Sequence, residues 1–136
     1  MKIFVTASKK FYDKVAEIIP QLEKLGHKVT PPNGYKSPGD EDRIYKLSSG
    51  EYQKWKAKMI RTDGKIVAAN DAVLVMNFEK NGQENYVGGS TFLEMFKAFD
   101  LGKKIYLYNP IPEGMLKDEI TGFGPVVING DLELIR

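Results

Sequence analysis

The sequence contains no cysteine and only one histidine among its 136 residues. A disulfide framework, a thiolate metal cluster and a cysteine nucleophile are therefore excluded, and His27 alone cannot form a zinc site. No stretch approaches the roughly 20 consecutive apolar residues of a membrane-spanning helix. Lys9 and Lys10 follow closely behind a short apolar run. This pattern of charge and hydrophobicity differs from that of a cleaved signal peptide. We expect a cytoplasmic protein with no membrane partner, no metal and no other cofactor.

The composition is that of a folded domain. Hydrophobic residues make up 42% of the chain and charged residues 28%, which excludes a disordered tail, a collagen-like fibre and a coiled coil. A chain of this length forms one domain and buries about two-thirds of the surface that its unfolded form exposes. We therefore expect a single domain over residues 1–136.

Charge is distributed unevenly along the chain. Residues 1–68 contain fourteen Lys and Arg against eight Asp and Glu, whereas residues 69–136 contain six against ten. A basic half could contact nucleic acid, and such a domain would show salt-dependent affinity without turnover. No nucleic-acid recognition motif accompanies the charge, so we expect no nucleic-acid partner.

Short apolar runs typical of buried strands alternate with apolar residues at helical spacing. Strands are predicted at residues 2–7, 27–31, 71–77, 104–108 and 125–128. Helices are predicted at about 11–25, from about 49, and at about 90–101, with a kink or restart at Pro20. A long loop is expected from Pro31 to Asp42. This order predicts an α/β domain with a doubly wound, mostly parallel sheet flanked by helices.

The segment after the strongest strand carries a candidate binding and catalytic motif. Gly88 and Gly89 allow close backbone approach, and the free amides near Ser90 and Thr91 favour an anion or an electron-rich oxygen. Glu94 in the first turn of this helix would stay ionised and could attack an electrophilic carbon. Thr91 and Glu94 also have the spacing of a capping box, in which Glu94 only satisfies the helix start.

Asp63 is a second displaced carboxylate. It falls on the apolar stripe of its helix, four residues after Met59 and three before Ile66. A buried aspartate needs a partner or a chemical task, although a local hydrogen bond to the backbone near Gly64 would also explain it.

The ordered set of these features resembles the nucleoside 2-deoxyribosyltransferase family, whose relatives include deoxynucleoside 5′-monophosphate N-glycosidases. The set comprises the inward Asp63, Asp71 at the start of the next strand, the Gly-Gly-Ser-Thr segment, Glu94 three residues after Thr91, and Ala98 one turn later. The similarity extends from Lys2 to about Asn109.

The resemblance implies a small Rossmann-like subunit, usually oligomeric, that acts on the N-glycosidic bond of a small-molecule nucleoside or nucleotide. Glu94 would be the nucleophile on C1′ of the sugar, and Asp63 the acid that protonates the departing base. A homodimer or higher homo-oligomer is also favoured by aromatic residues on the predicted helices that offer more apolar surface than one core absorbs, namely Tyr52, Trp55, Phe92, Phe96 and Phe99.

Two positions depart from the family pattern. Gly88 stands where many members carry an aspartate that holds the sugar, and residues 6–9 replace a Gly-Pro-like turn. Ser8, Lys9 and Ser90 are able to contact a phosphate, which favours a 5′-monophosphate substrate and hydrolysis. Gly88 also favours the alternative of a catalytically silent nucleotide-binding or sensing domain.

Other polar and aromatic residues have weaker assignments. Asn77 could hydrogen-bond a sugar hydroxyl or serve as a turn residue. Four aromatic residues could stack on a base or belong to the core: Tyr12, Tyr45, Tyr52 and Trp55. The polar loop at residues 78–88 is expected to be mobile without ligand and to order over it.

Overall fold

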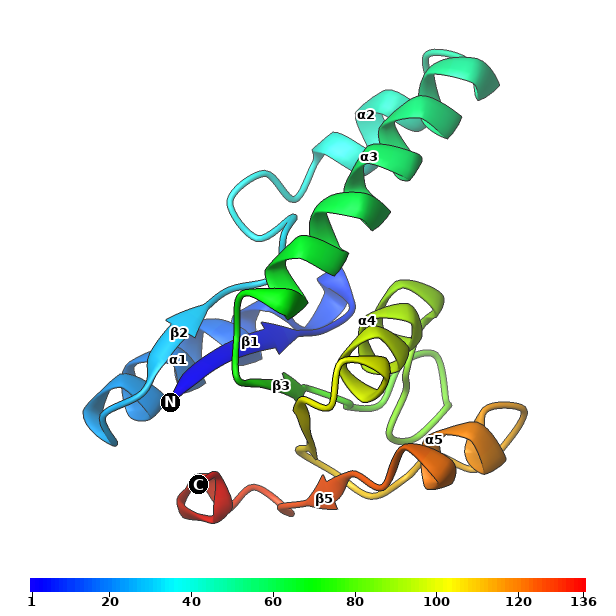
Figure 1. Cartoon of the computed structure of the whole chain (residues 1–136). Helices are drawn as coiled ribbons and strands as arrows, with labels where there is room; N and C mark the ends of the chain where they lie inside the picture. Colours follow the sequence, from blue (N-terminus) through cyan, green and yellow to red (C-terminus); the bar gives the residue numbers. More distant parts are fainter.

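Five strands form one parallel sheet in the order β2-β1-β3-β4-β5 in the computed structural model, which describes residues 1–136 (Figure 1). The strands are β1 (Lys2–Thr6), β2 (Lys28–Thr30), β3 (Ala72–Val75), β4 (Lys104–Leu107) and β5 (Val126–Val127). Every neighbouring pair is parallel. The predicted doubly wound α/β fold is confirmed, and the sheet is parallel throughout rather than mostly parallel.

Helices cover both faces of the sheet. They are α1 (Tyr12–Lys24), α2 (Asp40–Tyr45), α3 (Ser49–Ala68), α4 (Gly89–Asp100) and α5 (Lys117–Phe123), with short 3₁₀ helices η1 (Lys9–Phe11) and η2 (Leu132–Leu134). Helix α1 and the C-terminal segment pack on one face, and α3, α4 and α5 pack on the other. The N-terminal half of α3 extends beyond the sheet with α2 beside it (Figure 1).

The core follows from the alternation of side chains along buried strands. Ile3 and Val5 of β1 pack with α1, whereas Phe4 between them packs with the α3, α4 and α5 layer. Val15 and Leu22 of α1 are fully buried and lie on one helical face. Each face of the sheet is therefore closed by an apolar helix surface.

The helices differ from the sequence prediction at three places. Of the kink or restart predicted at Pro20, the restart was wrong, because α1 continues across it with Ile18 and Leu22 packed on the sheet on either side. Helix α2 forms at the end of the predicted loop although it buries no residue, and three acidic residues in its first turn favour the helix start. Helix α5 was not predicted, since Ile120 is its only buried residue.

The helix ends agree with their local sequence. Ser48 caps α3 by accepting a hydrogen bond from the Glu51 amide at 3.1 Å. Gly26 follows α1 with φ of 93°, a left-handed conformation that glycine adopts without strain. No helix of the chain has both the length and the apolar character that crossing a membrane requires.

Candidate active site

A cavity of about 510 Å³ lies at the carboxyl ends of β1 and β3, where the strand order reverses. Parallel α/β sheets bind ligands at this position because the loops from neighbouring strands diverge there. The cavity is lined by residues that follow β1 and β2, by residues of α2 and α3, and by the start of α4. Both displaced carboxylates identified in the sequence, Asp63 and Glu94, face this cavity.

Glu94 projects from α4 and is only 7% exposed. Its Oε1 accepts a hydrogen bond from Thr6 Oγ1 at 2.7 Å, and Thr6 Oγ1 lies 3.2 Å from Thr91 Oγ1. Because Thr6 is the last residue of β1, this contact fixes the carboxyl group against the edge of the sheet. Thr6 had no predicted role in the site, because its partner Glu94 lies 88 residues further along the chain.

The environment of Glu94 makes the carboxyl group hard to ionise. Burial, followed by the charge of Asp63, raises its pKa from 4.5 to about 8, although the Thr6 hydrogen bond and the Lys56 charge act in the opposite direction. The expectation that the helix dipole keeps Glu94 ionised was therefore wrong. Loss of hydration and a like charge outweigh the dipole at this position.

The capping-box interpretation of Thr91 and Glu94 was also wrong. The N-cap of α4 is Gly88, which has no side-chain cap, so Glu94 lies beyond the first turn. Its carboxyl group contacts β1 instead of the helix start. Glu94 therefore has no role in starting its own helix.

Asp63 projects from α3 and is partly buried. Asn33, in the segment after β2, donates a hydrogen bond from Nδ2 to Asp63 Oδ1 at 2.9 Å. Burial raises the pKa of Asp63, whereas the Asn33 hydrogen bond and the Lys56 charge lower it. The partner of Asp63 is thus a side chain from another element, and the alternative of a local bond near Gly64 was wrong.

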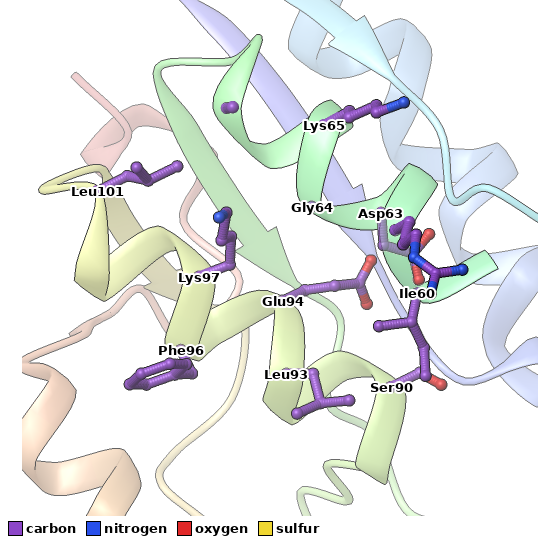
Figure 2. A pocket seen from close by; sticks show the side chains of 12 residues that line it. Ile60, Asp63, Gly64, Lys65, Ser90, Leu93, Glu94, Phe96, Lys97 and Leu101 are labelled. Carbon is purple, nitrogen blue, oxygen red and sulfur yellow. The ribbon is translucent and has the colours of Figure 1, made fainter. Parts of the chain in front are cut away.

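Two carboxyl groups of raised pKa therefore share one cavity from different helices, as Figure 2 shows for Glu94 reaching toward Asp63. Such a pair retains one proton over a range of pH, because a second negative charge is costly nearby. One member can then act as an acid while the other acts as a base or nucleophile. No group of three or more His, Asp or Glu side chains is arranged to hold a metal ion.

Three lysines supply positive charge around the pair. Lys56 Nζ lies 3.0 Å from Glu41 Oε2 and 3.2 Å from Ser90 Oγ. Lys80 Nζ donates to Ser8 Oγ at 3.1 Å and lies 4.8 Å from the centroid of the Tyr86 ring. Lys9 is paired with Asp42 at 3.0 Å. Lys80 forms no ion pair and is the free cation of the three.

Most of the residues predicted to bind substrate line the cavity, namely Ser8, Lys9, Gly88, Gly89, Ser90 and Thr91. Asn77 does not, because it is fully buried and bonded to the segment after β4. Its Nδ2 donates to the carbonyl groups of Asn109 and Pro110, and its Oδ1 accepts from the Asn109 amide at 2.9 Å. Asn77 joins two strand ends and is unavailable to a sugar.

The ring of Tyr86 lies against Gly88. A Cβ atom at position 88 would lie 3.2 Å from Tyr86 Oη and 3.3 Å from a ring carbon. The ring therefore occupies the space into which an aspartate side chain at position 88 would project. Tyr86 and Lys80 together form this wall of the cavity.

Of the four aromatic residues considered for base stacking, Tyr12 and Trp55 line the cavity, whereas Tyr45 and Tyr52 do not. None of the four is fully buried, although Tyr12 packs against the core on the α1 face of the sheet. Burial, followed by the charges of Glu94 and Asp63, raises the pKa of Tyr12 to about 12. Its hydroxyl group is therefore neutral and able to donate a hydrogen bond near the carboxyl pair.

A groove of about 570 Å³ runs between α3 and α4 (Figure 2). It shares Asp63, Ser90 and Glu94 with the cavity. Its outer part is apolar and contains four side chains that are each more than two-fifths exposed: Ile60, Leu93, Phe96 and Leu101. The two carboxyl groups are thus reached through a polar cavity and through an apolar groove.

The protein shares its fold with a solved 2-deoxyribosyltransferase from the psychrotolerant bacterium Bacillus psychrosaccharolyticus. The TM-score is 0.51 at 17% sequence identity, and the match covers 79% of this chain and 71% of that chain. That enzyme is characterised as a biocatalyst for the synthesis of nucleosides. No protein-family model and no curated protein matches the chain.

Proposed function

We propose that this protein cleaves or transfers at the N-glycosidic bond of a nucleoside or a nucleoside 5′-monophosphate. The observation that carries the proposal is the convergence of Glu94 and Asp63, from two helices, on one cavity at the strand-order reversal. Glycosidic chemistry commonly uses two carboxyl groups, of which one acts on the sugar and the other on the leaving group. The fold shared with a 2-deoxyribosyltransferase supports the same assignment.

Glu94 is proposed as the nucleophile. Its carboxylate attacks C1′ as the C1′–N bond breaks, and the electron pair of that bond passes to the base nitrogen. Asp63 donates its proton to the departing base, so the single proton of the pair is used in this step. Water or a second base then attacks C1′ of the glycosyl ester and releases Glu94, and Asp63 accepts the proton of the attacking molecule.

A phosphorylated substrate is favoured by the polar wall of the cavity. Ser8 and Ser90 each bond a lysine ammonium group, and Lys80 has no carboxylate partner to neutralise it. A phosphate dianion is the type of group that such hydroxyl and ammonium donors bind. Tyr86 beside Gly88, in place of a sugar-holding aspartate, favours water over a second base as the acceptor.

The second candidate is a catalytically silent domain that binds a nucleotide in the same cavity. The raised pKa of Glu94, about 8, favours it because a protonated carboxyl group is not a nucleophile. Such a domain would bind nucleotides without releasing the base.

The two functions are separated by incubating the protein with ribo- and deoxyribonucleosides and their 5′-monophosphates, followed by chromatography for free base. We expect base release from at least one monophosphate. Glu23→Gln, on the exposed face of α1, serves as the matched control for Glu94→Gln and should retain full turnover. Binding without base release across the whole panel would establish the silent domain instead.

A further inference from the structure

Lys56 joins three elements at the edge of the cavity. It projects from α3 and contacts Glu41 Oε2 of α2 at 3.0 Å and Ser90 Oγ at the start of α4 at 3.2 Å. Its ammonium group also lies 5.8 Å from the centroid of the Trp55 ring. Three groups thus surround the ammonium position, although the Lys56 side chain is one-third exposed.

The other cations near the site have different partners. Lys9 is paired with Asp42, and Lys80 contacts Ser8 and Tyr86. The α3–α4 groove is also lined by three basic side chains, Arg61, Lys65 and Lys97. Of all these cations, only Lys56 lowers the pKa of both Asp63 and Glu94.

The groups that face Glu94 come from every element packed around it. Thr6 of β1 bonds its carboxyl group, Tyr12 of α1 carries a neutral hydroxyl group nearby, and Asp63 of α3 contributes a like charge. Thr91 of its own helix contacts Thr6. Lys56 lines the same cavity as both carboxyl groups and contacts Ser90, which lies one turn before Glu94 on α4. It is therefore the cation placed to balance the pair.

We infer that Lys56 is a positioning residue of this site. Its ammonium group, held between Glu41 and Ser90, supplies the positive charge that allows Asp63 and Glu94 to carry one negative charge between them. Glu41 fixes the ammonium position and, with Tyr52 Oη donating to the same carboxylate at 3.0 Å, ties α2 to α3 over the cavity. The consequence for turnover rests on the proposed function, whereas the charge balance does not.

The direct test is a carboxyl ¹³C NMR titration of Glu94 from about pH 4 to about pH 10 in a set of variants. Lys56→Gln should raise the pKa of Glu94 by about one unit, because it removes a cation near the carboxyl group. Lys56→Arg keeps the charge and should give a value close to that of the wild type. Lys54→Gln, which removes an exposed lysine from the same helix, should have no effect.

Two further variants distinguish charge from packing. Lys56→Met keeps the apolar stem and replaces Lys56→Gln if the latter does not fold. Glu41→Gln removes the carboxylate charge beside Lys56 but keeps an oxygen that accepts its hydrogen bond, and so should not raise the pKa of Glu94. An unchanged pKa in a folded Lys56→Gln or Lys56→Met variant would overturn the inference, as would an equal rise in Glu41→Gln.

A turnover readout separates this inference from the proposed function. If base release is found, Lys56→Gln should move the alkaline limb of the kcat/KM profile to higher pH, whereas Lys56→Arg should leave it in place. A residue that only supports the fold would lower activity without moving that limb. If no substrate is turned over, the proposed function fails, and the NMR titration still decides the role of Lys56.

Discussion

The ionisation of Glu94 links the site to the stability of the whole protein. Its pKa is about 8 in the folded protein against an ordinary value of 4.5. Between these values the unfolded chain has lost this proton while the folded protein retains it. The stabilising contribution of the neutral group is therefore fully present below about pH 4.5 and is lost as the pH rises to about 8.

Glu94→Gln should remove this dependence, because the amide stays neutral at every pH. We expect the variant to match the wild type near pH 5 and to exceed it at pH 8 by on the order of a few kcal/mol in free energy of unfolding. Urea denaturation at a series of pH values measures the difference. A wild type whose stability rises over the same range, relative to Glu94→Gln, would contradict the assigned ionisation.

The carboxyl pair also predicts a pH profile for the proposed reaction. The reactive state holds one proton over Asp63 and Glu94, so kcat/KM should fall above about pH 8, where that proton is lost. Asp63→Asn removes both the acid and the like charge that raises the pKa of Glu94. It should slow the reaction and abolish the alkaline limb, and it should affect least those substrates whose base leaves easily.

The residues of the site differed in how far the sequence could predict them. Asp63 and Glu94 were identified because each carboxylate interrupts an apolar helical face, a pattern visible within a dozen residues. Asn33 and Lys56 were missed, since each gains its significance only from a partner on another element. Asn77 was misassigned because its position at a strand end is the same whether it faces a ligand or a neighbouring strand.

At the level of elements, β1, β3, β4, α1 and α4 could be predicted because each carries buried apolar residues in a run or stripe. Helix α3 was predicted from its apolar spacing, although Val67 is its only buried residue. Helix α2 lacked this signal because it is held by polar contacts, Lys9 with Asp42 and Glu41 with Lys56 and Tyr52. Elements positioned by polar contacts give no hydrophobic periodicity and therefore escape sequence patterns.

The segment between β3 and α4 is the element expected to respond to ligand. Residues 81–84 are exposed, and the segment contacts the end of β1 through Lys80 and Ser8. Nucleotide binding should slow amide exchange across residues 78–88, since a phosphate would add a contact to Lys80. Lys80→Gln should weaken this protection, and equal exchange with and without nucleotide would contradict the proposed closure.

At the scale of the whole molecule, the apolar groove between α3 and α4 favours the proposed homodimer. Phe96 is 51% exposed and Leu93 47%, beside the opening that leads to Glu94. A second copy covering this surface would exclude water from that side of the carboxyl pair.

Sedimentation should therefore detect a dimer at tens of micromolar protein, an order-of-magnitude concentration for weak association. Phe96→Glu should shift the protein toward monomer, because it places a charge on the covered surface. Leu134→Glu, which changes an exposed apolar residue of η2, should not. A wild-type monomer at this concentration would count against the dimer.

The most direct measurement of the central proposal is the mass of the peptide that contains Glu94 after a reaction with a hydrolysable substrate is quenched. One added sugar or sugar phosphate is expected on that peptide in the wild type and none in Glu94→Gln. Turnover by Glu94→Gln should fall by at least about a thousandfold, because an amide cannot form the glycosyl ester. A folded Glu94→Gln variant with wild-type turnover, and no sugar on the Glu94 peptide of the wild type, would contradict it.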